Sequence, residues 1–160
     1  MTFTLTSNDL TPGGKLPERH VFNGMGYNGE NLSPHLAWDH VPAGTKSFVI
    51  TVFDPDAPTG SGWWHWTVAN LPAGTRSLPQ GAGSGKASLP AGAVQGRTDF
   101  GSAGYGGAAP PQGESHRYQF TVHALDVESI AVDENASGAI VGFNLHFHSL
   151  GKATLEVSYS

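Results

Sequence analysis

Three short stretches of the chain place ionisable side chains beside prolines and glycines. They are residues 54–58 (Asp-Pro-Asp-Ala-Pro), residues 62–66 (Gly-Trp-Trp-His-Trp) and residues 104–118, which begin Gly-Tyr-Gly-Gly and end His-Arg-Tyr. Carboxylates, imidazoles and a phenol can bind an anion or act as general acids and bases. Either chemistry requires the three stretches to meet in space.

The carboxylates of Asp54 and Asp56 are expected in a stiff turn that follows an apolar strand. Pro55 fixes the backbone just before Asp56, and Pro58 restricts the backbone just after Asp56. The alternative is an ordinary turn capped by Asp side chains, which are common in turns because they bond to the local backbone.

His65, His116 and Tyr118 are the other candidates for a site. By strand alternation His65 is expected on the opposite face from Trp64 and Trp66, and a buried structural histidine is its alternative interpretation. His116 and Tyr118 are two residues apart and therefore point the same way from a strand. The glycines of residues 104–107 let the backbone approach a ligand closely. Together with the two aspartates, these groups would form a small polar cavity.

A metal site is a further alternative, since His and Asp are ligand types that suit Zn²⁺. No regular spacing fixes a ligand set, so we expect no metal and no other cofactor. We interpret the six remaining histidines as structural or surface residues: His20, His35, His40, His123, His146 and His148.

Five strands and one helix are predicted to position these groups. Apolar alternation and β-branched or aromatic runs between turn residues predict strands at residues 2–6, 47–53, 64–70, 117–126 and 153–159. Residues 81–111 are predicted to form a long Gly-rich loop with a short strand near 91–96. The helix is predicted to run from an N-cap at Asp133 to a stop at Gly151, with an apolar face of Ala136, Ile140, Phe143, Phe147 and Leu150.

This ratio of strands to helix predicts a mainly β fold, an antiparallel sandwich that forms one domain over residues 1–160. The chain has 8 Lys and Arg against 13 Asp and Glu, a formal charge of −5, so it offers no basic face for nucleic acid. It has no cysteine, which excludes disulfides and zinc sites built on sulfur. Because it shows neither a secretory signal pattern nor a run of roughly 20 apolar residues, we expect a cytoplasmic protein with no membrane span.

The order of motifs along nearly the whole chain resembles the phosphatidylethanolamine-binding protein (PEBP) family, and more narrowly its prokaryotic Raf-kinase-inhibitor-like branch. Three positions depart from that pattern: Ala108 replaces a proline, Val157 replaces a glycine, and the C-terminus lacks a basic residue. The resemblance is carried by residues 33–38, 54–58, 64–66, 70–72, 99–101, 104–107, 110–113, 116–118 and 142–145.

The resemblance implies a β-sandwich with Greek-key connections and, at one end, a pocket for phosphate, a phosphorylated head group or a carboxylate such as acetate. It leaves open a protein partner, as the name of the branch suggests, and a homodimer. By position it assigns ligand binding to Asp54, Asp56, Pro58, His65, Ala109, His116 and Tyr118, with Ala109 offering a backbone N–H.

We interpret the protein as a binding or regulatory module for small anionic or phosphorylated ligands. Carboxylates would repel an anion, so we expect Asp54 and Asp56 to orient and charge His65 and His116, which would then contact the anion together with Tyr118. The alternative is a hydrolase acting on phosphate or acyl esters through the same Asp and His side chains. The sequence has no nucleophile-elbow serine and no Gly-Lys-Ser/Thr phosphate motif, so we prefer the binding module.

Overall fold

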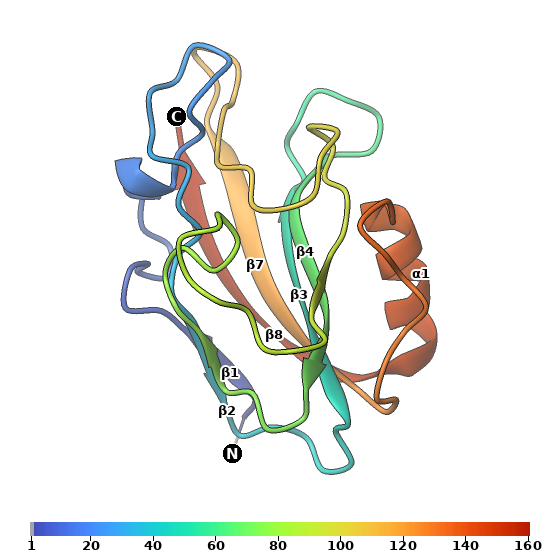
Figure 1. Ribbon diagram of the computed structural model, residues 1–160. Helices are drawn as coiled ribbons and strands as arrows, with labels where there is room; N and C mark the ends of the chain where they lie inside the picture. Colours follow the sequence, from blue (N-terminus) through green and yellow to red (C-terminus); the bar gives the residue numbers. More distant parts are fainter. Residues whose placement is uncertain (1) are drawn as a thin grey trace.

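The computed structural model describes residues 2–160 and consists mainly of antiparallel strands in two sheets (Figure 1). The smaller sheet has the order β1 (Thr4–Thr6), β2 (Leu36–Asp39), β5 (Ser77–Leu78). The larger sheet has the order β6 (Val94–Gln95), β4 (Trp63–Pro72), β3 (Ser47–Asp54), β7 (His116–Leu125), β8 (Ser149–Tyr159). A 3-10 turn, η1 (Glu18–His20), and one helix, α1 (Gly138–His148), complete the elements. The predicted fold class, mainly β with a C-terminal helix and a long Gly-rich loop, is confirmed.

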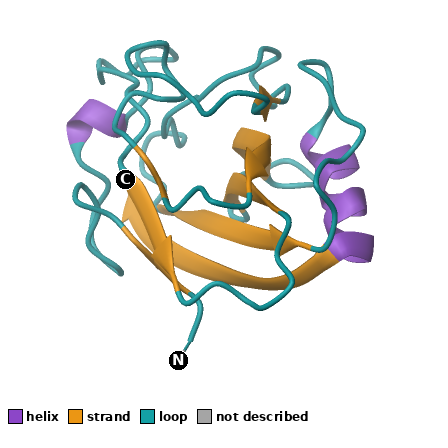
Figure 2. Ribbon diagram, turned by 60° about the horizontal axis from the view of Figure 1, so that its bottom comes forward, coloured by secondary structure: helices purple, strands orange, loops and turns teal. Residues whose placement is uncertain are grey.

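Strand β3 is the centre of the larger sheet, between β4 and β7. Its apolar residues up to Val52 are buried on both faces, because the sheet is covered on both sides, and Phe53 is half-buried. Phe48, Ile50 and Val52 belong to the main core, which fills the space between the two sheets. Val49 belongs to a second core under α1, which packs on the other face (Figure 2). A strand covered in this way reads as a continuous apolar run, which is why the sequence predicted it well.

Strand β4 does not keep the simple alternation that the sequence predicts. Its pairing with β3 shifts by one residue, since Val52 faces Trp66 while Phe53 faces Trp64, and this leaves His65 as the extra residue of a β-bulge. Trp66 is in the core between the sheets, whereas Trp64 packs on Phe53 on the helix side. The prediction that Trp64 and Trp66 share a face is therefore wrong, and the bulge is the physical reason.

Helix α1 begins later than predicted and buries a different face. Its N-cap is Ser137, whose hydroxyl accepts a hydrogen bond from the Ile140 N–H, while Asp133 caps an earlier turn. A Cβ atom added at Gly138 would lie 2.2 Å from the ring of Trp64, so the helix starts where its backbone can rest on that indole. This contact fixes the rotation of α1.

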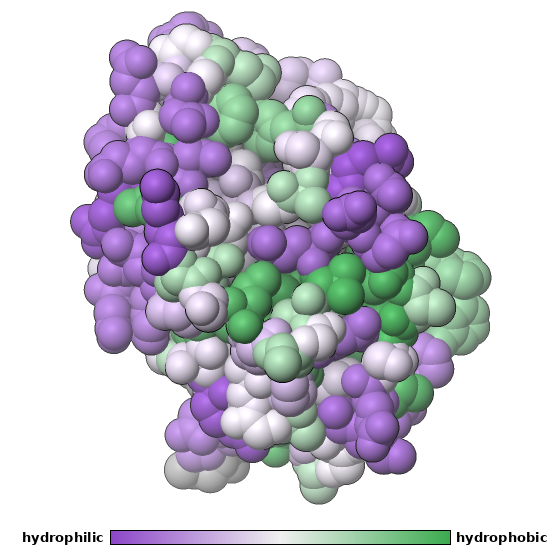
Figure 3. All heavy atoms as spheres, in the orientation of Figure 1, coloured by the Kyte–Doolittle hydropathy of each residue, from purple (hydrophilic) through white to green (hydrophobic). Residues whose placement is uncertain are grey.

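The buried residues of α1 are Gly138, Val141 and Leu145. The predicted apolar face is wrong, because Phe143 and Phe147 are 63% and 61% exposed, and Ile140 and Leu150 are exposed as well. In Figure 3 apolar side chains gather on the surface over α1. The chain also leaves the helix at His148 rather than at Gly151, and β8 begins at once with Ser149. Within residues 2–160, no helix combines the length and the hydrophobicity needed to cross a membrane.

Candidate functional site

A cavity of about 200 Å³ opens at one end of the larger sheet, where β3 ends and β4 and β7 begin. Its lining is largely apolar, made of aromatic rings, prolines and small side chains, with a few polar and ionisable groups among them. The residues that line it are Met25, Asp54, Ala57, Pro58, Thr59, Trp63, His65, Phe100, Ala109, Pro110, Pro111, His116 and Tyr118. The three stretches singled out in the sequence thus meet at one place.

The sheet itself brings Asp54, His116 and Tyr118 together. β3 and β7 are antiparallel neighbours, so the last residue of β3 lies beside the first residues of β7. Alternate residues of both strands point to the same face, where Val52 and Phe120 belong to the core. The floor of the cavity therefore continues the core face of the sheet, with polar residues replacing apolar ones at the strand ends.

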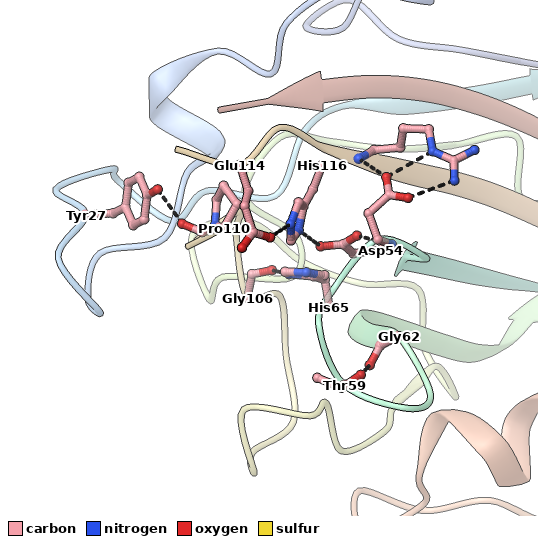
Figure 4. A network of polar contacts seen from close by, with 11 residues as sticks. Tyr27, Asp54, Thr59, Gly62, His65, Gly106, Pro110, Glu114 and His116 are labelled. Carbon is pink, nitrogen blue, oxygen red and sulfur yellow. Dashed lines mark hydrogen bonds and ion pairs between the residues drawn. The ribbon is translucent and has the colours of Figure 1, made fainter. Parts of the chain in front are cut away.

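His116 is held between two carboxylates. Its Nδ1 donates a hydrogen bond to Asp54 Oδ2 at 2.7 Å, and its Nε2 donates one to Glu114 Oε1, also at 2.7 Å (Figure 4). The ring is only 3% exposed, and Asp54 is equally buried. Burial disfavours the charged ring, but the hydrogen bonds to Glu114 and Asp54 outweigh it and raise the pKa of His116. Both carboxylate contacts therefore favour the protonated, cationic form of His116.

His65 is held differently. Its Nδ1 lies 2.8 Å from the carbonyl oxygen of Gly106, and its ring packs edge-on against Phe100 and Tyr118. Burial lowers the pKa of His65, although the Gly106 carbonyl and Asp54 oppose this shift. The expectation that both histidines are charged by aspartates is therefore wrong for His65, because the ring is anchored by a carbonyl and surrounded by apolar groups.

The β-bulge of β4 explains how His65 reaches the cavity. Strict alternation would place its side chain on the helix side, opposite Trp66. As the extra residue of the bulge, His65 instead packs against Tyr118, on the face of the sheet that carries the core. Bulges commonly redirect a side chain next to a functional site in this way.

Tyr118 contributes an unsatisfied polar group to the cavity. Its hydroxyl is buried and has no hydrogen-bond partner within residues 2–160, and the same holds for the indole N–H of Trp63, which also lines the cavity. Burial, with a smaller contribution from the charge of Asp54, raises the pKa of Tyr118, so the phenol stays protonated. Buried polar groups in native proteins nearly always have a partner, so each exception needs an explanation.

Asp56 does not line the cavity, unlike the other six residues assigned to ligand binding. Its carboxylate accepts hydrogen bonds from the backbone and guanidinium N–H groups of Arg117 at 2.8 to 3.0 Å. The Arg117 contacts lower the pKa of Asp56 to about 2. Asp54 and Asp56 point in different directions because the Asp54 side chain accepts a hydrogen bond from the Asp56 N–H within the turn, while the Asp56 carboxylate faces Arg117 near the start of β7. The assignment of Asp56 to ligand binding therefore stays a prediction, since its carboxylate pairs with Arg117 and does not line the cavity.

The glycine pair at residues 106 and 107 allows the long loop to close the cavity. A Cβ atom at Gly106 would lie 2.4 Å from the Phe100 ring, and one at Gly107 would lie 2.3 Å from the His20 carbonyl oxygen. The Gly106 N–H bonds to the His65 carbonyl, and the Gly107 N–H bonds to the side chain of Asn31. The loop is thus tied to β4 and to the N-terminal segment, and it carries Ala109 to the cavity wall.

Sequence reasoning missed Glu114 and most of the apolar wall. Glu114 stands two residues before His116, and an acidic residue so close to a candidate histidine was the available signal. Trp63 and Phe100 lie in stretches that the sequence analysis named but were not assigned to the site, and Met25 comes from a segment that it did not single out. Within residues 2–160, no cluster of three or more His, Asp or Glu side chains has the geometry of a metal site.

Comparisons with known proteins agree with this architecture. A family model described as phosphatidylethanolamine-binding protein matches residues 6–160. The UPF0098 protein YbhB of Escherichia coli K12 is 71% identical over 156 residues, covering 98% of this chain and 99% of that protein. The UPF0098 protein YbcL of the same organism is 55% identical over 159 residues, covering 98% and 87%.

Solved structures of PEBP-family proteins have a similar fold. The crystal structure of E. coli YbcL, described as a new member of the mammalian PEBP family, matches with a TM-score of 0.96 at 54% identity and covers 99% of this chain and 98% of that one. A PEBP homologue from Chlamydia trachomatis matches with a TM-score of 0.83 at 31% identity, covering 99% and 97%. With a matching family model over nearly its whole length and relatives this similar, the chain belongs to the phosphatidylethanolamine-binding protein family.

Proposed function

We propose that the protein binds a small anionic group, such as phosphate, a phosphorylated head group or a carboxylate, in the cavity at the end of β3, β4 and β7. The observation that carries this proposal is the Tyr118 hydroxyl, which is buried without a partner in residues 2–160 and shares the cavity with the charged ring of His116. An unpaired buried hydroxyl costs free energy, and a ligand oxygen that accepts a hydrogen bond from it would remove that cost.

We expect the binding to be weak. Charge-assisted hydrogen bonds contribute roughly 1.5–3 kcal/mol each, so two or three of them correspond to a Kd between about millimolar and micromolar. Glu114 already accepts the hydrogen bond of His116 Nε2, so an anion must displace Glu114 to reach that nitrogen. This exchange lowers the net gain further.

Calorimetric titration with inorganic phosphate tests the proposal. Tyr118→Phe removes only the hydroxyl, so we expect the phosphate affinity to fall about tenfold or more while the melting temperature stays the same or rises. Tyr105→Phe is the matched control, because the Tyr105 hydroxyl donates to the His20 carbonyl and Tyr105 does not line the cavity. It should lower the melting temperature and leave the phosphate affinity unchanged. Equal affinity in wild type and Tyr118→Phe would contradict the proposal.

The hydrolase alternative rests on the Asp54 and His116 pair, in which a carboxylate orients an imidazole as it does for a general base. The nitrogen that would activate water, His116 Nε2, donates to Glu114 instead. We therefore prefer the binding function. Hydrolysis of p-nitrophenyl phosphate and p-nitrophenyl acetate, measured with His116→Gln as the control, distinguishes the two.

A protein partner and a cytoplasmic location stay predictions of the sequence analysis. Microscopy of a C-terminally tagged chain tests the location. Crosslinking of that same tagged chain in cells, followed by mass spectrometry, tests for a partner.

A further inference from the structure

We propose that the cavity selects an oxyacid group that still carries a proton, namely the monoanion of phosphate or of a phosphomonoester, and that His65 Nε2 accepts the hydrogen bond from that proton. The inference rests on the proposed function and deepens it, because it names the chemical form of the ligand. In this proposal His65 determines specificity by accepting a hydrogen bond from the ligand, and it does not attract the ligand as a positive charge.

The first step is the tautomer of His65. The Gly106 carbonyl oxygen can only accept a hydrogen bond, so the Nδ1 atom 2.8 Å away must carry a proton. A neutral imidazole with a proton on Nδ1 has a lone pair on Nε2. His65 lines the cavity and its Nδ1 is used by Gly106, so we assign Nε2 as the acceptor that the ring can offer to a ligand.

The second step is that the surroundings of His65 favour the neutral ring. Burial lowers the pKa of His65, and the groups that act against this are the carbonyls of Gly106 and Gly107 and the carboxylates of Asp54 and Asp99. The ring faces carbon on its other sides, from Phe100 in the long loop and Tyr118 in β7. A fully deprotonated anion has no hydrogen to give to Nε2, so its oxygen would face a lone pair.

The third step is the charge around His116. Its ring lies between two carboxylates, those of Asp54 and Glu114, which favour its protonated form and already accept both of its N–H groups. The residues that line the cavity, all within the described part of the chain, include no Lys or Arg. Arg117, the nearest in sequence, is paired with Asp56 outside the cavity. The site therefore lacks the positive charge that a dianion needs.

A protonated monoanion fits both conditions. Its P–OH group donates to His65 Nε2, and one of its other oxygens accepts the hydrogen bond of the Tyr118 hydroxyl, which has no partner of its own in residues 2–160. A phosphodiester carries the same single charge but has no proton to donate. The arrangement therefore predicts discrimination between two ligands of equal charge.

Calorimetric titration of the wild-type protein at pH 5.5 with methyl phosphate and dimethyl phosphate tests this directly. Methyl phosphate is mainly a protonated monoanion there, since phosphomonoesters lose their second proton near pH 6. We expect methyl phosphate to bind about tenfold or more tightly than dimethyl phosphate, and to weaken between pH 5.5 and 8. Inorganic phosphate, titrated in parallel, shows whether the ester group adds affinity.

His65→Asn is the matched variant. Its short amide places an N–H near the position of Nδ1 and preserves the bond to Gly106, but nothing replaces Nε2. We expect this variant to bind the two ligands with similar, weak affinity. Nitrogen NMR shifts of His65 in the wild type report the tautomer independently and keep the inference testable if the variant does not fold.

Each remaining result has a definite meaning. Equal affinity of the wild type for both ligands would overturn the selection of a protonated group and leave the anion-binding function intact. If neither ligand nor inorganic phosphate binds, the proposed binding of phosphate groups fails and this inference fails with it. A cationic His65, seen by NMR at pH 7, would also overturn it.

Discussion

The chemistry of the site depends on which nitrogens of His116 and His65 carry protons. His116 donates one N–H to a buried carboxylate from β3 and the other to Glu114, which stands on the turn just before β7 and is 46% exposed. The buried partner orients the ring, and the exposed one can exchange with solvent or with a ligand. His65, in the same cavity, places its Nδ1 against the Gly106 carbonyl oxygen instead of a carboxylate and keeps its proton on that nitrogen. Two residues of one type thus have opposite roles, a donor and an acceptor, because their partners differ.

The pH dependence of stability follows from the raised pKa of His116. Since its pKa is higher in the folded than in the unfolded protein, the stabilisation is complete below the unfolded value of about 6.5 and is lost as the pH rises through the folded value. We expect Glu114→Gln to lower the pKa of His116 and to shift this loss of stability to lower pH. NMR titration of His116 and urea unfolding between pH 5 and 9 measure both effects.

Asp56→Asn is the matched control for Glu114→Gln. It also removes one carboxylate from the same end of the sheet, but one that pairs with Arg117 outside the cavity. We expect it to change the pKa of His116 less than Glu114→Gln does. If Glu114→Gln leaves the His116 titration where it is, the contact between Glu114 and Nε2 does not persist in solution.

At the scale of elements, single contacts between strand and helix decide the arrangement. The bulge in β4 separates Trp64 from Trp66, sending the first toward α1 and the second into the main core. Gly138 then rests on Trp64, and the helix is rotated so that Val141 and Leu145 face the sheet. The same bulge turns His65 toward the cavity. One irregular residue thus links the site to the position of the helix.

A pair of substitutions in α1 tests this rotation. Leu145 is 8% exposed and packs in the core under the helix, so Leu145→Ala should lower the free energy of unfolding by about 2–5 kcal/mol. Phe143 is 63% exposed, so Phe143→Ala should change it by less than about 1 kcal/mol. Urea unfolding of both variants measures the difference. A larger loss for Phe143→Ala would mean that the helix buries the other face.

At the scale of the whole molecule, the cavity is a product of the sheet and of three loops that close over its end. The main core joins side chains of both sheets, such as Trp38 from β2 and Phe48 from β3, whose rings are 5.4 Å apart. The N-terminal segment is tied to the long loop through bonds from Tyr105 to His20 and from Gly107 to Asn31. The N-terminal segment and the long loop, although distant in sequence, therefore hold one another in position.

Because β3 contributes to both the main core and the core under α1, we predict that residues 1–160 unfold as one cooperative domain. We expect a single calorimetric transition whose enthalpy equals the van't Hoff enthalpy. Tryptophan fluorescence and far-ultraviolet circular dichroism should report the same midpoint in urea. Two resolved transitions would show that the helix side and the sandwich unfold separately.

Much of the fold and part of the candidate site could be predicted from the sequence, because they depend on local chemistry. The apolar run at residues 47–53 predicted the central strand, and the Asp-Pro step after it predicted where that strand ends. The spacing of His116 and Tyr118 predicted their shared face, since side chains alternate along a strand. The resemblance of the ordered motifs to the PEBP family predicted the fold, which the comparisons confirm.

Only the tertiary structure decided which polar groups face the cavity and in which state. Asp54 and Asp56 look equivalent in sequence, yet one bonds to His116 and the other to Arg117, because the turn between them points the carboxylates apart. The charge of each histidine depends on partners that lie far away in sequence, Gly106 for His65 and Asp54 for His116. The local sequence pattern determines the strands and the direction in which their side chains point. Whether a histidine nitrogen carries a proton depends instead on the burial of the ring and on the atom that faces that nitrogen. Burial and these contacts exist only once the chain has folded.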